Sequence, residues 1–379
     1  MTSLVTPSWG LRPVTKPTIL LGEAMGEAEF RHGVGFIGTS GIELLRMLDE
    51  VGFIELTSID TNYLSRYYRE GDPMFIDAIW RLHPEVHRTN VFQFHPPGNR
   101  LDLVCGPKAQ GIPGFPALFQ SKYVPRSLEH HLTRLSDELL ELDPNLIICL
   151  GNAALWALAG STGISKRRGT TLLSTHTAAD FKLLPTYHPA AVLRDWSLRP
   201  VTLLDLAKAK REAGFPELRR PERYIWIEPT LEDLETFYAT QIVGCAYLAV
   251  DIETAGNQIT CIGFSPNPNI GLVLPFHDSR ATGGNYWASP SNEREAWSFV
   301  RRVLVDTRIK KVFQNGLYDI AFLWRSVGIP VHGAEHDTML LHHALYPESL
   351  KSLGFLGSLY TDEGAWKQER KTSTIKRDE

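Results

Sequence analysis

Small and acidic residues follow the first expected strand of the chain. The apolar run 18–21 is typical of a buried strand, and it leads directly into Gly22, Glu23 and Gly26. Glycines let the backbone come close to a ligand, and the helix expected after Ser40 would favour an anion near its N-terminus. A tight turn between a strand and a helix would account for the same glycines. The loop alone therefore leaves a binding role and a purely structural role open.

Other side chains suited to chemistry also lie where expected strands meet loops. Asn90 stands beside the apolar pair Val91-Phe92, and His188 stands in a His-Pro loop after a short expected strand. Further along, Asp251 and Glu253 lie near the end of the strand expected in GCAYLAVDIET. Open α/β sheets bind ligands beside strand ends that lead into helices. These residues are therefore candidate site residues in two separate parts of the chain.

The spacing of the expected strands and helices predicts an α/β protein with two domains. From Pro17 to about Phe215 strands and helices alternate, which favours a parallel sheet with helices on both faces. Residues 216–223 are rich in Pro, Arg and Glu and are expected to form a linker. Beyond the linker, ITCIGFSP and IGLVLPF look like antiparallel partners. We therefore expect one domain over residues 1–215 and a second over residues 224–379.

Length and composition narrow the class of protein. A chain of 379 residues is too long for one ordinary core, and 43% hydrophobic with 22% charged residues is typical of a globular protein. No apolar run approaches the ~20 residues of a membrane span, and the N-terminus lacks the pattern of a secretory signal. An intracellular, cytoplasmic protein is expected. With a net charge of −4, any nucleic acid must be bound by local basic patches.

Four short motifs occur in a specific order in the first domain. They are GEAMG followed by Phe36, TN shortly before PPGNR, RRG, and PTYHPAAVLR. This series resembles the motifs of the uracil-DNA glycosylase superfamily, most of all its bacterial and archaeal family 4 branch, over about residues 17–210. The resemblance implies a three-layer α/β/α fold and hydrolysis of the N-glycosidic bond of deoxyuridine in DNA. The base would be flipped out of the stack into a pocket.

The resemblance also implies roles for individual residues in that pocket. Phe36 matches the ring that stacks on uracil, and Asn90 matches the amide that reads uracil and rejects cytosine, because an amide both donates and accepts. His188 matches the histidine that hydrogen-bonds uracil O2 and stabilises the departing anionic base. Glu23 matches a position where a carboxylate can orient water, and the Asp of other branches would fall at Ala24. A core Phe and a turn-capping Asn are the ordinary alternatives.

Two of the motifs are also implied to contact DNA. Leu193 and Arg194 match the loop that wedges into the minor groove, with an apolar plug and a phosphate anchor. Arg167 and Arg168 are expected to hold backbone phosphates, with a solvated basic turn as the alternative. These four residues are therefore the candidate DNA-binding residues of the first domain.

The chain departs from family 4 in two respects. Members of that branch usually bind an iron–sulfur cluster through four cysteines, two of them near the N-terminus. Here only Cys105 lies near the expected place, Phe94 stands where another ligand would be, and no CxxC pair occurs, so no iron–sulfur cluster is expected. In addition, 54 residues separate Phe36 from Asn90, which suggests an insertion over Asn62–Arg88. That segment could stand in for the cluster or contact a partner.

The second domain carries a different series of motifs. DIET, NGLYD and DTMLLHHALYP resemble the 3′–5′ proofreading exonuclease of family A DNA polymerases, which has an RNase H-like fold with a mixed sheet. In that family four carboxylates hold two divalent metals. Asp251, Glu253 and Asp319 match three of them, and the chain stops at Glu379 before the fourth is expected. The resemblance implies an incomplete exonuclease-like domain that could bind Mg²⁺ or Mn²⁺ weakly, with Asp337 as a poor substitute ligand.

Three hypotheses for function follow from these motifs. The first is a DNA-repair hydrolase that removes uracil and uses its exonuclease-like domain to engage DNA or a separate DNA polymerase subunit, in a phage or bacterial replication setting. The second is a 3′–5′ exonuclease with a uracil-sensing domain. The third is a non-catalytic DNA-binding or replication-assembly protein. Glu23, Phe36, Asn90 and His188 favour the first for domain one, whereas the missing carboxylate favours the third for domain two.

Overall fold

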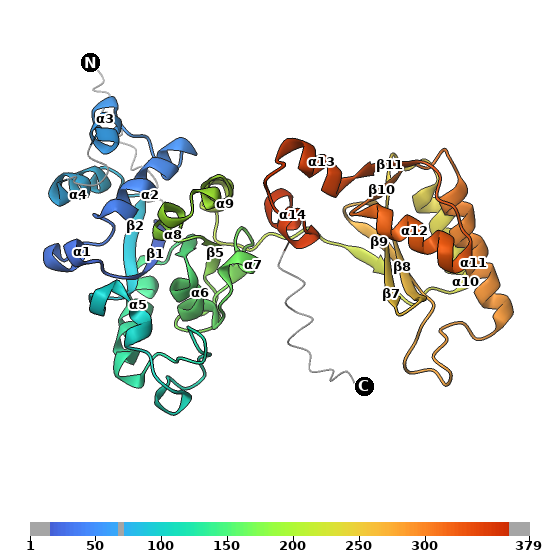
Figure 1. Ribbon diagram of the computed structural model, residues 1–379, viewed down its shortest axis with the longest axis horizontal. Coiled ribbons are helices and arrows are strands. Elements are labelled where there is room, and N and C mark those ends of the chain that lie inside the picture. Colours follow the sequence, from blue (N-terminus) through green and yellow to red (C-terminus); the bar gives the residue numbers. More distant parts are fainter. Residues whose placement is uncertain (1–15, 67–71, 364–379) are drawn as a thin grey trace, which may run out of the picture. The chain divides into compact units, whose positions relative to one another are not determined.

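The computed structural model describes residues 16–66 and 72–363, which fall into two compact units (Figure 1). The first unit extends to Arg219 and also includes the segment that begins at Gly357, and the second covers Arg220–Leu356. Each unit is described separately below. Within the described ranges, no helix combines the length and apolar character needed to cross a membrane.

A five-stranded sheet forms the centre of the first unit. Its strand order is β2-β1-β3-β5-β4, and neighbouring strands are parallel except for β4, which runs antiparallel to β5. The expected α/β class with a mostly parallel sheet is therefore confirmed. The strands are β1 (Thr18–Ala24), β2 (Val86–Phe92), β3 (Leu146–Leu150), β4 (Leu172–Leu173) and β5 (Lys182–Thr186).

Strand β1 is longer than its apolar run suggests. We expected the strand to break at Gly22, but it continues to Ala24 and pairs Gly22 with Asn90 of β2. The expectation is wrong because the ladder to β2 also holds the residues beyond the apolar run, and backbone pairing needs no apolar side chain. As a result, Glu23 and Asn90 lie on neighbouring strands at the same end of the sheet.

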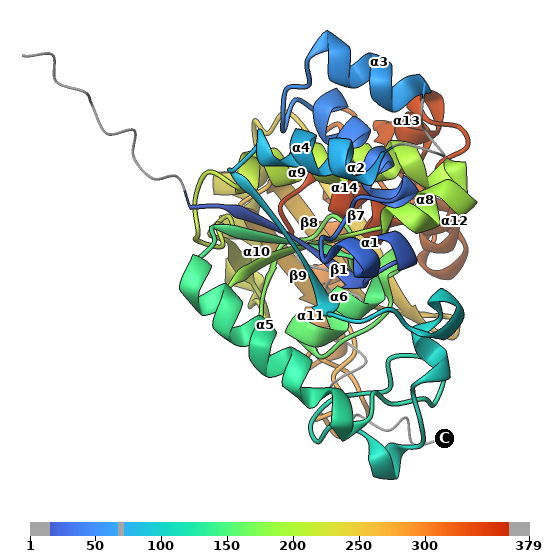
Figure 2. The same cartoon turned by 90° about the vertical axis from the view of Figure 1, so that its left-hand side faces the viewer.

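Helices cover both faces of this sheet, because successive strand residues point to opposite sides. Leu20 packs in one core cluster with α2 (Thr39–Glu50) and α4 (Pro73–Arg81), whereas Ile19 and Leu21 pack in another with α5 (Glu129–Leu142) and α6 (Asn152–Ala159). Figures 1 and 2 show α2 and α4 on one side of β1 and α5 on the other. The remaining helices of this unit are α1 (Glu27–His32), α3 (Ser58–Arg66), α7 (Ile164–Arg167), α8 (Pro189–Arg194) and α9 (Arg199–Glu212).

The segment that we interpreted as an insertion is part of the first unit's core. Helix α4 begins after Asp72, whose carboxylate accepts the backbone N–H of Met74, and Pro73 occupies its first turn. Its buried residues Ile79 and Trp80 join the same core cluster as α2. The insertion therefore packs directly onto the helix that follows the Phe36 loop.

The second unit is built around a six-stranded mixed sheet. Its order is β11-β10-β7-β8-β9-β6, in which β7, β8 and β9 form antiparallel pairs and the outer pairs are parallel. The expected antiparallel pairing of ITCIGFSP with IGLVLPF is therefore confirmed, as is the mixed sheet. The strands are β6 (Tyr224–Trp226), β7 (Leu248–Ala255), β8 (Gln258–Asn267), β9 (Ile270–Pro275), β10 (Lys311–Phe313) and β11 (Ala334–Asp337).

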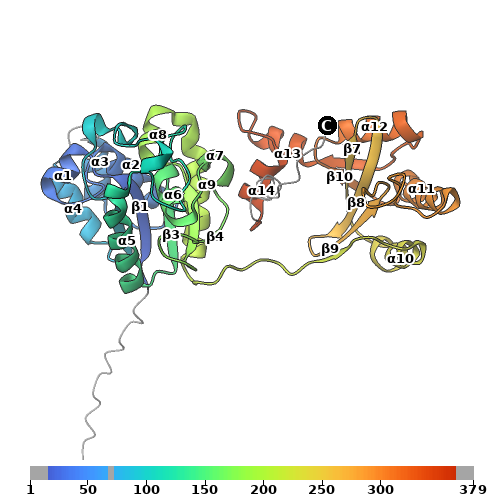
Figure 3. The ribbon, with the colours of Figure 1, turned by 90° about the horizontal axis from the view of Figure 1, so that it is seen from below.

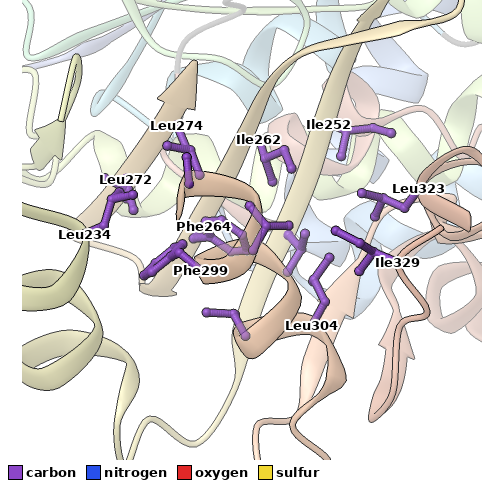
Figure 4. Close-up of a cluster of buried hydrophobic side chains, with 14 of the residues drawn as sticks. Leu234, Ile252, Ile262, Phe264, Leu272, Leu274, Phe299, Leu304, Leu323 and Ile329 are labelled. Atoms are coloured by element: carbon purple, nitrogen blue, oxygen red, sulfur yellow. The ribbon is translucent and has the colours of Figure 1, made fainter. Parts of the chain in front are cut away.

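One face of this second sheet holds the hydrophobic core. Helices α10 (Leu231–Phe237) and α11 (Pro290–Val305) lie on the same side of β8 and β9 (Figure 3), and Phe299 of α11 packs with Phe264 and Leu272 of the strands (Figure 4). Along β7 the even-numbered residues 248–252 are buried and Asp251 and Glu253 are exposed. The two carboxylates therefore lie on the face opposite this core. The other helices are α12 (Gly316–Val327) and α13 (Thr338–Leu345).

The last described residues belong to the first unit rather than the second. We expected residues 224–379 to form one domain, but the chain from Gly357, within α14 (Leu353–Tyr360), groups with the first unit. There the Ser358 hydroxyl accepts a hydrogen bond from Arg168 at 3.0 Å, and the carbonyl oxygen of Thr361 accepts one from Nζ of Lys208 at 2.8 Å. The first unit is thus assembled from two separate stretches of sequence.

Candidate active site

A pocket of about 500 Å³ lies at the end of the first sheet where β1, β2 and β5 lead into loops and helices. Its lining includes five residues that the sequence singled out: Glu23, Phe36, Asn90, His188 and Arg194. The structure therefore brings together residues as far apart in the chain as Glu23 and Arg194. Residues that sequence reasoning missed also line the pocket, among them Asn152 and Tyr187.

Gly22 makes room for two of these side chains. A Cβ atom built on Gly22 would lie only 2.2 Å from Oδ1 of Asn90 and 2.7 Å from Cζ of Phe36. Because real Cβ atoms do not approach other atoms so closely, any other residue at this position would push the amide or the ring out of place. The backbone of Asn90 is fixed as well, since its carbonyl oxygen accepts a hydrogen bond from Arg134 at 2.6 Å.

Phe36 occupies a backbone conformation that is unusual for a residue with a side chain. Its φ angle of 61° lies in the left-handed region, which costs on the order of 1 kcal/mol for a residue other than glycine. The backbone N–H of Phe36 donates to Oε1 of Glu29 at 2.7 Å, and the ring is buried. The ring centroid lies 6.4 Å from that of His188, with an angle of 27° between the two planes. The strained loop therefore presents a buried ring to the pocket.

His188 is held as a neutral imidazole. It caps the N-terminus of α8, where its Nδ1 accepts the backbone N–H of Ala190 at 3.1 Å. Burial, and to a smaller extent the nearby positive charge of Arg194, lowers the pKa of His188 to about 4. A neutral ring that accepts at Nδ1 carries its proton on Nε2. His188 can therefore donate one hydrogen bond from Nε2 without carrying a charge.

Glu23 lies in a setting that disfavours its ionised form. Burial raises the pKa of Glu23, the charge of Arg194 opposes that rise, and the charge of Asp102 adds to it. A partly desolvated carboxylate beside a cation is suited to hydrogen-bonding a water molecule or to stabilising positive charge. The structure thus places a carboxylate at the pocket, whereas Ala24, the other position considered, has no side chain able to do so.

The four candidate DNA-binding residues differ in accessibility. Arg194 is exposed at the end of α8, Leu193 beside it is half-buried, and Arg167 lies at the end of α7. Arg168 is buried, at 1% exposure, and its Nε donates to Oδ2 of Asp205 at 2.7 Å. The expectation that Arg168 holds DNA phosphates is therefore wrong, because its guanidinium is enclosed with a buried carboxylate.

The carboxylates of the second unit come close without forming a complete ligand set. Asp319 on α12 accepts the backbone N–H of Ile252 at 3.1 Å, between Asp251 and Glu253 on β7. The pKa of Asp319 is raised to about 6, chiefly by burial, with the Ile252 hydrogen bond opposing the rise and the charge of Asp251 adding to it. Across residues 16–66 and 72–363, no three His, Cys, Asp or Glu side chains are grouped so that they could hold a metal.

Asp337 has a structural role in the second unit. Its carboxylate accepts the backbone N–H groups of Gly316 at 2.8 Å and Met339 at 2.8 Å, and it caps the N-terminus of α13. These hydrogen bonds occupy the carboxylate with backbone donors. Asp337 is therefore poorly suited to replace a missing metal ligand.

Two residues near the expected place of an iron–sulfur cluster, Phe94 and Cys105, lie in environments that do not favour cluster ligation. Phe94 packs in the core cluster that contains α5 and α6, and its ring lies 5.5 Å from that of His131. Burial raises the pKa of the Cys105 thiol to about 11, with a smaller opposing effect of Lys122. Cluster ligation requires thiolates, and a raised pKa disfavours the thiolate.

Comparison with known families agrees with this geometry. The model of the Uracil DNA glycosylase superfamily matches residues 10–213, which is more than half of the chain. This chain belongs to the uracil DNA glycosylase superfamily. A 3′–5′ exonuclease model matches residues 224–376, so a glycosylase-superfamily domain and an exonuclease-family domain are fused in one chain.

Two curated proteins illustrate the likeness of this superfamily member to others. The Type-4 uracil-DNA glycosylase of Sulfurisphaera tokodaii is 26% identical over 204 residues, covering 52% of this chain and 71% of that protein. A DNA polymerase of Bacillus phage SP01 is 21% identical over 289 residues, covering 68% of this chain and 28% of the polymerase. The chain therefore spans less than a third of the polymerase that it matches.

Two solved structures each match part of this chain. NrnC of Brucella melitensis with bound Mg²⁺ is 17% identical with a TM-score of 0.26, covering 38% of this chain and 62% of that one. The EXD2 exonuclease domain soaked in Mg and GMP is 14% identical with a TM-score of 0.24, covering 32% of this chain and 59% of that one.

The close packing at Gly22 leads to a first prediction. Gly22→Ala is expected to destabilise the glycosylase-superfamily unit by about 1–3 kcal/mol, because the added methyl group must displace Asn90 or Phe36. Urea unfolding measures this change. The matched control is Gly214→Ala, since a Cβ there would meet its nearest atom, the carbonyl oxygen of Arg211, at an ordinary 3.6 Å. Equal stability of the two variants would contradict the packing argument.

The protonation state of His188 gives a second prediction. The folded chain takes up a proton at His188 near pH 4, whereas the unfolded chain does so near the ordinary pKa of 6.5. The unfolded state therefore binds more protons between these values, and His188 makes the fold less stable as the pH falls through that window. NMR of the labelled imidazole should show a neutral ring from pH 5 to 8. Arg194→Gln should raise the pKa, and a midpoint near 6.5 in the unaltered protein would contradict the assignment.

Proposed function

We propose that the first unit removes uracil from DNA by hydrolysing the N-glycosidic bond of deoxyuridine after the base has flipped into the pocket. The observation that carries this proposal is the meeting of Phe36, Asn90 and His188 around one cavity. Each supplies a different interaction that a flipped pyrimidine needs: a stacking surface, an amide and a neutral hydrogen-bond donor. The match of residues 10–213 to the superfamily supports the same reaction.

Phe36 and Asn90 are proposed to select the base. The buried Phe36 ring would stack on the face of uracil, and the Asn90 amide would donate to O4 and accept from N3–H. Cytosine presents a donor where uracil has O4 and an acceptor where uracil has N3–H. It would therefore leave a buried amide mismatched, which costs about 1–3 kcal/mol for each unsatisfied group.

His188 is proposed to stabilise the leaving base. As the C1′–N1 bond breaks, its electron pair moves onto the base, and negative charge develops on O2. The Nε2–H of neutral His188 would donate to that oxygen. A water oxygen then bonds to C1′ and loses a proton to solvent. Glu23 would orient this water or, when ionised, stabilise the positive charge of the sugar.

The DNA itself is proposed to lie along the exposed end of α8. Arg194 would bind a phosphate and Leu193 would fill the space that the flipped base leaves, with Arg167 as a second phosphate contact. The protein would thus act in base excision repair on uracil-containing DNA. No cofactor takes part in the hydrolysis as proposed.

The test uses a 5′-labelled oligonucleotide with one uracil, incubated with Mg²⁺ and separately with EDTA. Alkali-dependent cleavage at the uracil is expected in both conditions. His188→Ala should slow uracil release on the order of 10²-fold or more, because the oxyanion donor is lost. His130→Ala, an exposed histidine on α5, is the matched control and should retain full activity. Unchanged turnover in His188→Ala would remove its proposed role.

A second candidate function concerns the exonuclease-family unit. The Asp319 carboxylate accepts the N–H of Ile252, the residue between Asp251 and Glu253 in sequence, and repulsion from Asp251 contributes to the raised pKa of Asp319. A divalent cation would relieve that repulsion, and carboxylate oxygens are the ligands that Mg²⁺ and Mn²⁺ prefer. The described residues do not complete a metal site, so we propose that this unit by itself binds cations weakly and serves mainly to engage DNA or a DNA polymerase. The likeness to a phage DNA polymerase supports a replication-linked partner.

Cation binding by this unit should depend on pH. The pKa of Asp319 is about 6, so its carboxylate is protonated at pH 5 and ionised at pH 7.5. Titration calorimetry with Mn²⁺ should therefore show weak binding at pH 7.5 that is lost at pH 5. Asp251→Asn should weaken binding at pH 7.5, whereas Asp278→Asn, in an exposed ion pair with Arg280, should not. Tight binding at both pH values would contradict this description of the site.

A further inference from the structure

The loop that carries Phe36 is fixed by side chains on both of the peptide groups next to that residue. In the peptide group before Phe36, the carbonyl oxygen of Gly35 accepts from Nη1 of Arg88 at 2.9 Å, and the N–H of Phe36 donates to Glu29. In the peptide group after it, the carbonyl oxygen of Phe36 accepts from Nε1 of Trp80 at 2.9 Å. Because φ and ψ of one residue are set by the two flanking peptide planes, these contacts define the conformation of Phe36.

Two of the three contacts depend on helix α4. Trp80 lies on α4 and is buried, with 1% of its surface exposed. Asp77, one turn earlier, is buried as well and accepts from Nη2 of Arg88 at 2.9 Å. The Arg88 guanidinium also lies 5.1 Å from the centre of the Trp80 ring. The helix therefore supplies one hydrogen bond to the loop directly and orients the arginine that supplies another.

The charges in this arrangement are balanced. Burial alone would raise the pKa of Asp77, but hydrogen bonds and charge from Arg88 and Arg81 lower it, so the carboxylate is ionised. Arg88 is largely enclosed, and an arginine with an ionised partner keeps a fixed direction because its planar fork matches the carboxylate. Such a pair can hold a backbone carbonyl in place against the strain of a left-handed residue.

We propose that α4 is a positioning element for the base-stacking ring, and that Trp80 is its central residue. The inference rests on the proposed function, because it assigns to Trp80 and the Asp77–Arg88 pair the task of holding Phe36 where uracil is to stack. Without these contacts the strained φ of 61° would no longer be the favoured conformation. The segment that separates Phe36 from Asn90 in sequence would then have a direct role in binding the base.

Trp80→Phe tests this inference, since it removes the indole N–H and keeps an aromatic ring. The matched control is Trp156→Phe, because Trp156 is also buried in the first unit and its Nε1 donates to the carbonyl oxygen of Pro116 at 2.8 Å. Both variants lose one indole hydrogen bond, so a merely structural effect should be similar in the two. A positioning effect should appear only in Trp80→Phe.

Two measurements on the full-length chain separate the outcomes. The inhibition constant of free uracil should rise about tenfold in Trp80→Phe, as expected when one hydrogen bond to a buried carbonyl is lost, and should not change in Trp156→Phe. Hydrogen exchange of the backbone amides over residues 33–38 should become faster only in Trp80→Phe. Asp77→Asn should change both quantities in the same direction, whereas Arg81→Gln, which removes only the exposed partner of Asp77, should not.

The hydrogen-exchange and uracil-inhibition measurements can give contrary results independently of each other. Their combination therefore separates a failure of this inference from a failure of the proposed function. Unchanged exchange over 33–38 in Trp80→Phe would overturn the positioning role whatever the protein binds. Faster exchange with an unchanged inhibition constant would also overturn it, because the loop would then move without affecting the base. If the unaltered protein does not bind uracil, the proposed function fails, and the exchange data alone decide whether α4 holds the loop.

Discussion

The absence of a side chain at Gly22 is the constraint on which the pocket depends. Strands β1 and β2 pair in parallel register with Gly22 opposite Asn90, so the Asn90 amide must lie over β1 at that point. A Cβ atom on Gly22 would overlap both that amide and the Phe36 ring. The ring occupies this space from a left-handed backbone, and Glu29, Arg88 and Trp80 hold the flanking peptide groups through hydrogen bonds. The absence of a Cβ atom at Gly22 thus connects the register of the sheet, the conformation of the Phe36 loop and helix α4.

The pKa values of two pocket residues depend on the charge of one side chain, that of Arg194. Arg194 lowers the pKa of both Glu23 and His188, although burial acts on the two groups in opposite directions. For the carboxyl group the arginine favours the ionised form, and for the imidazole it favours the neutral form. These are the protonation states that the proposed hydrolysis requires, and the same side chain is exposed where DNA is expected to bind. Binding a phosphate at Arg194 would weaken its effect on both groups, so substrate binding and protonation are physically coupled.

The sequence allowed prediction of those strands and site residues that are marked by local hydrophobic periodicity or by motif spacing. The strand Leu146–Leu150 and the antiparallel pair β8–β9 could be predicted because short apolar runs bounded by turn residues are typical of buried strands. The extension of β1 past Gly22 and the burial of Arg168 could not, since each depends on a partner far away in sequence, β2 in one case and Asp205 in the other. The bond of Glu29 to the Gly26 N–H at the start of α1 is local in sequence, whereas its bond to the Phe36 N–H reaches across the following loop.

The two units differ in how hydrogen bonds hold their candidate site residues. This difference affects how well each unit is prepared for catalysis. Around the first pocket, the Phe36 N–H donates to Glu29, the His188 ring accepts the Ala190 N–H of the helix that it caps, and the Asn90 carbonyl oxygen accepts from Arg134. In the second unit Asp319 accepts the Ile252 amide and Asp337 caps α13, while Asp251 and Glu253 lie on an exposed face of β7. Preorganised groups lower a reaction barrier because no ordering is left to do in the transition state. The physical argument for catalysis is therefore stronger at the first pocket, since no group of three or more described His, Cys, Asp or Glu side chains in the second unit could hold a metal.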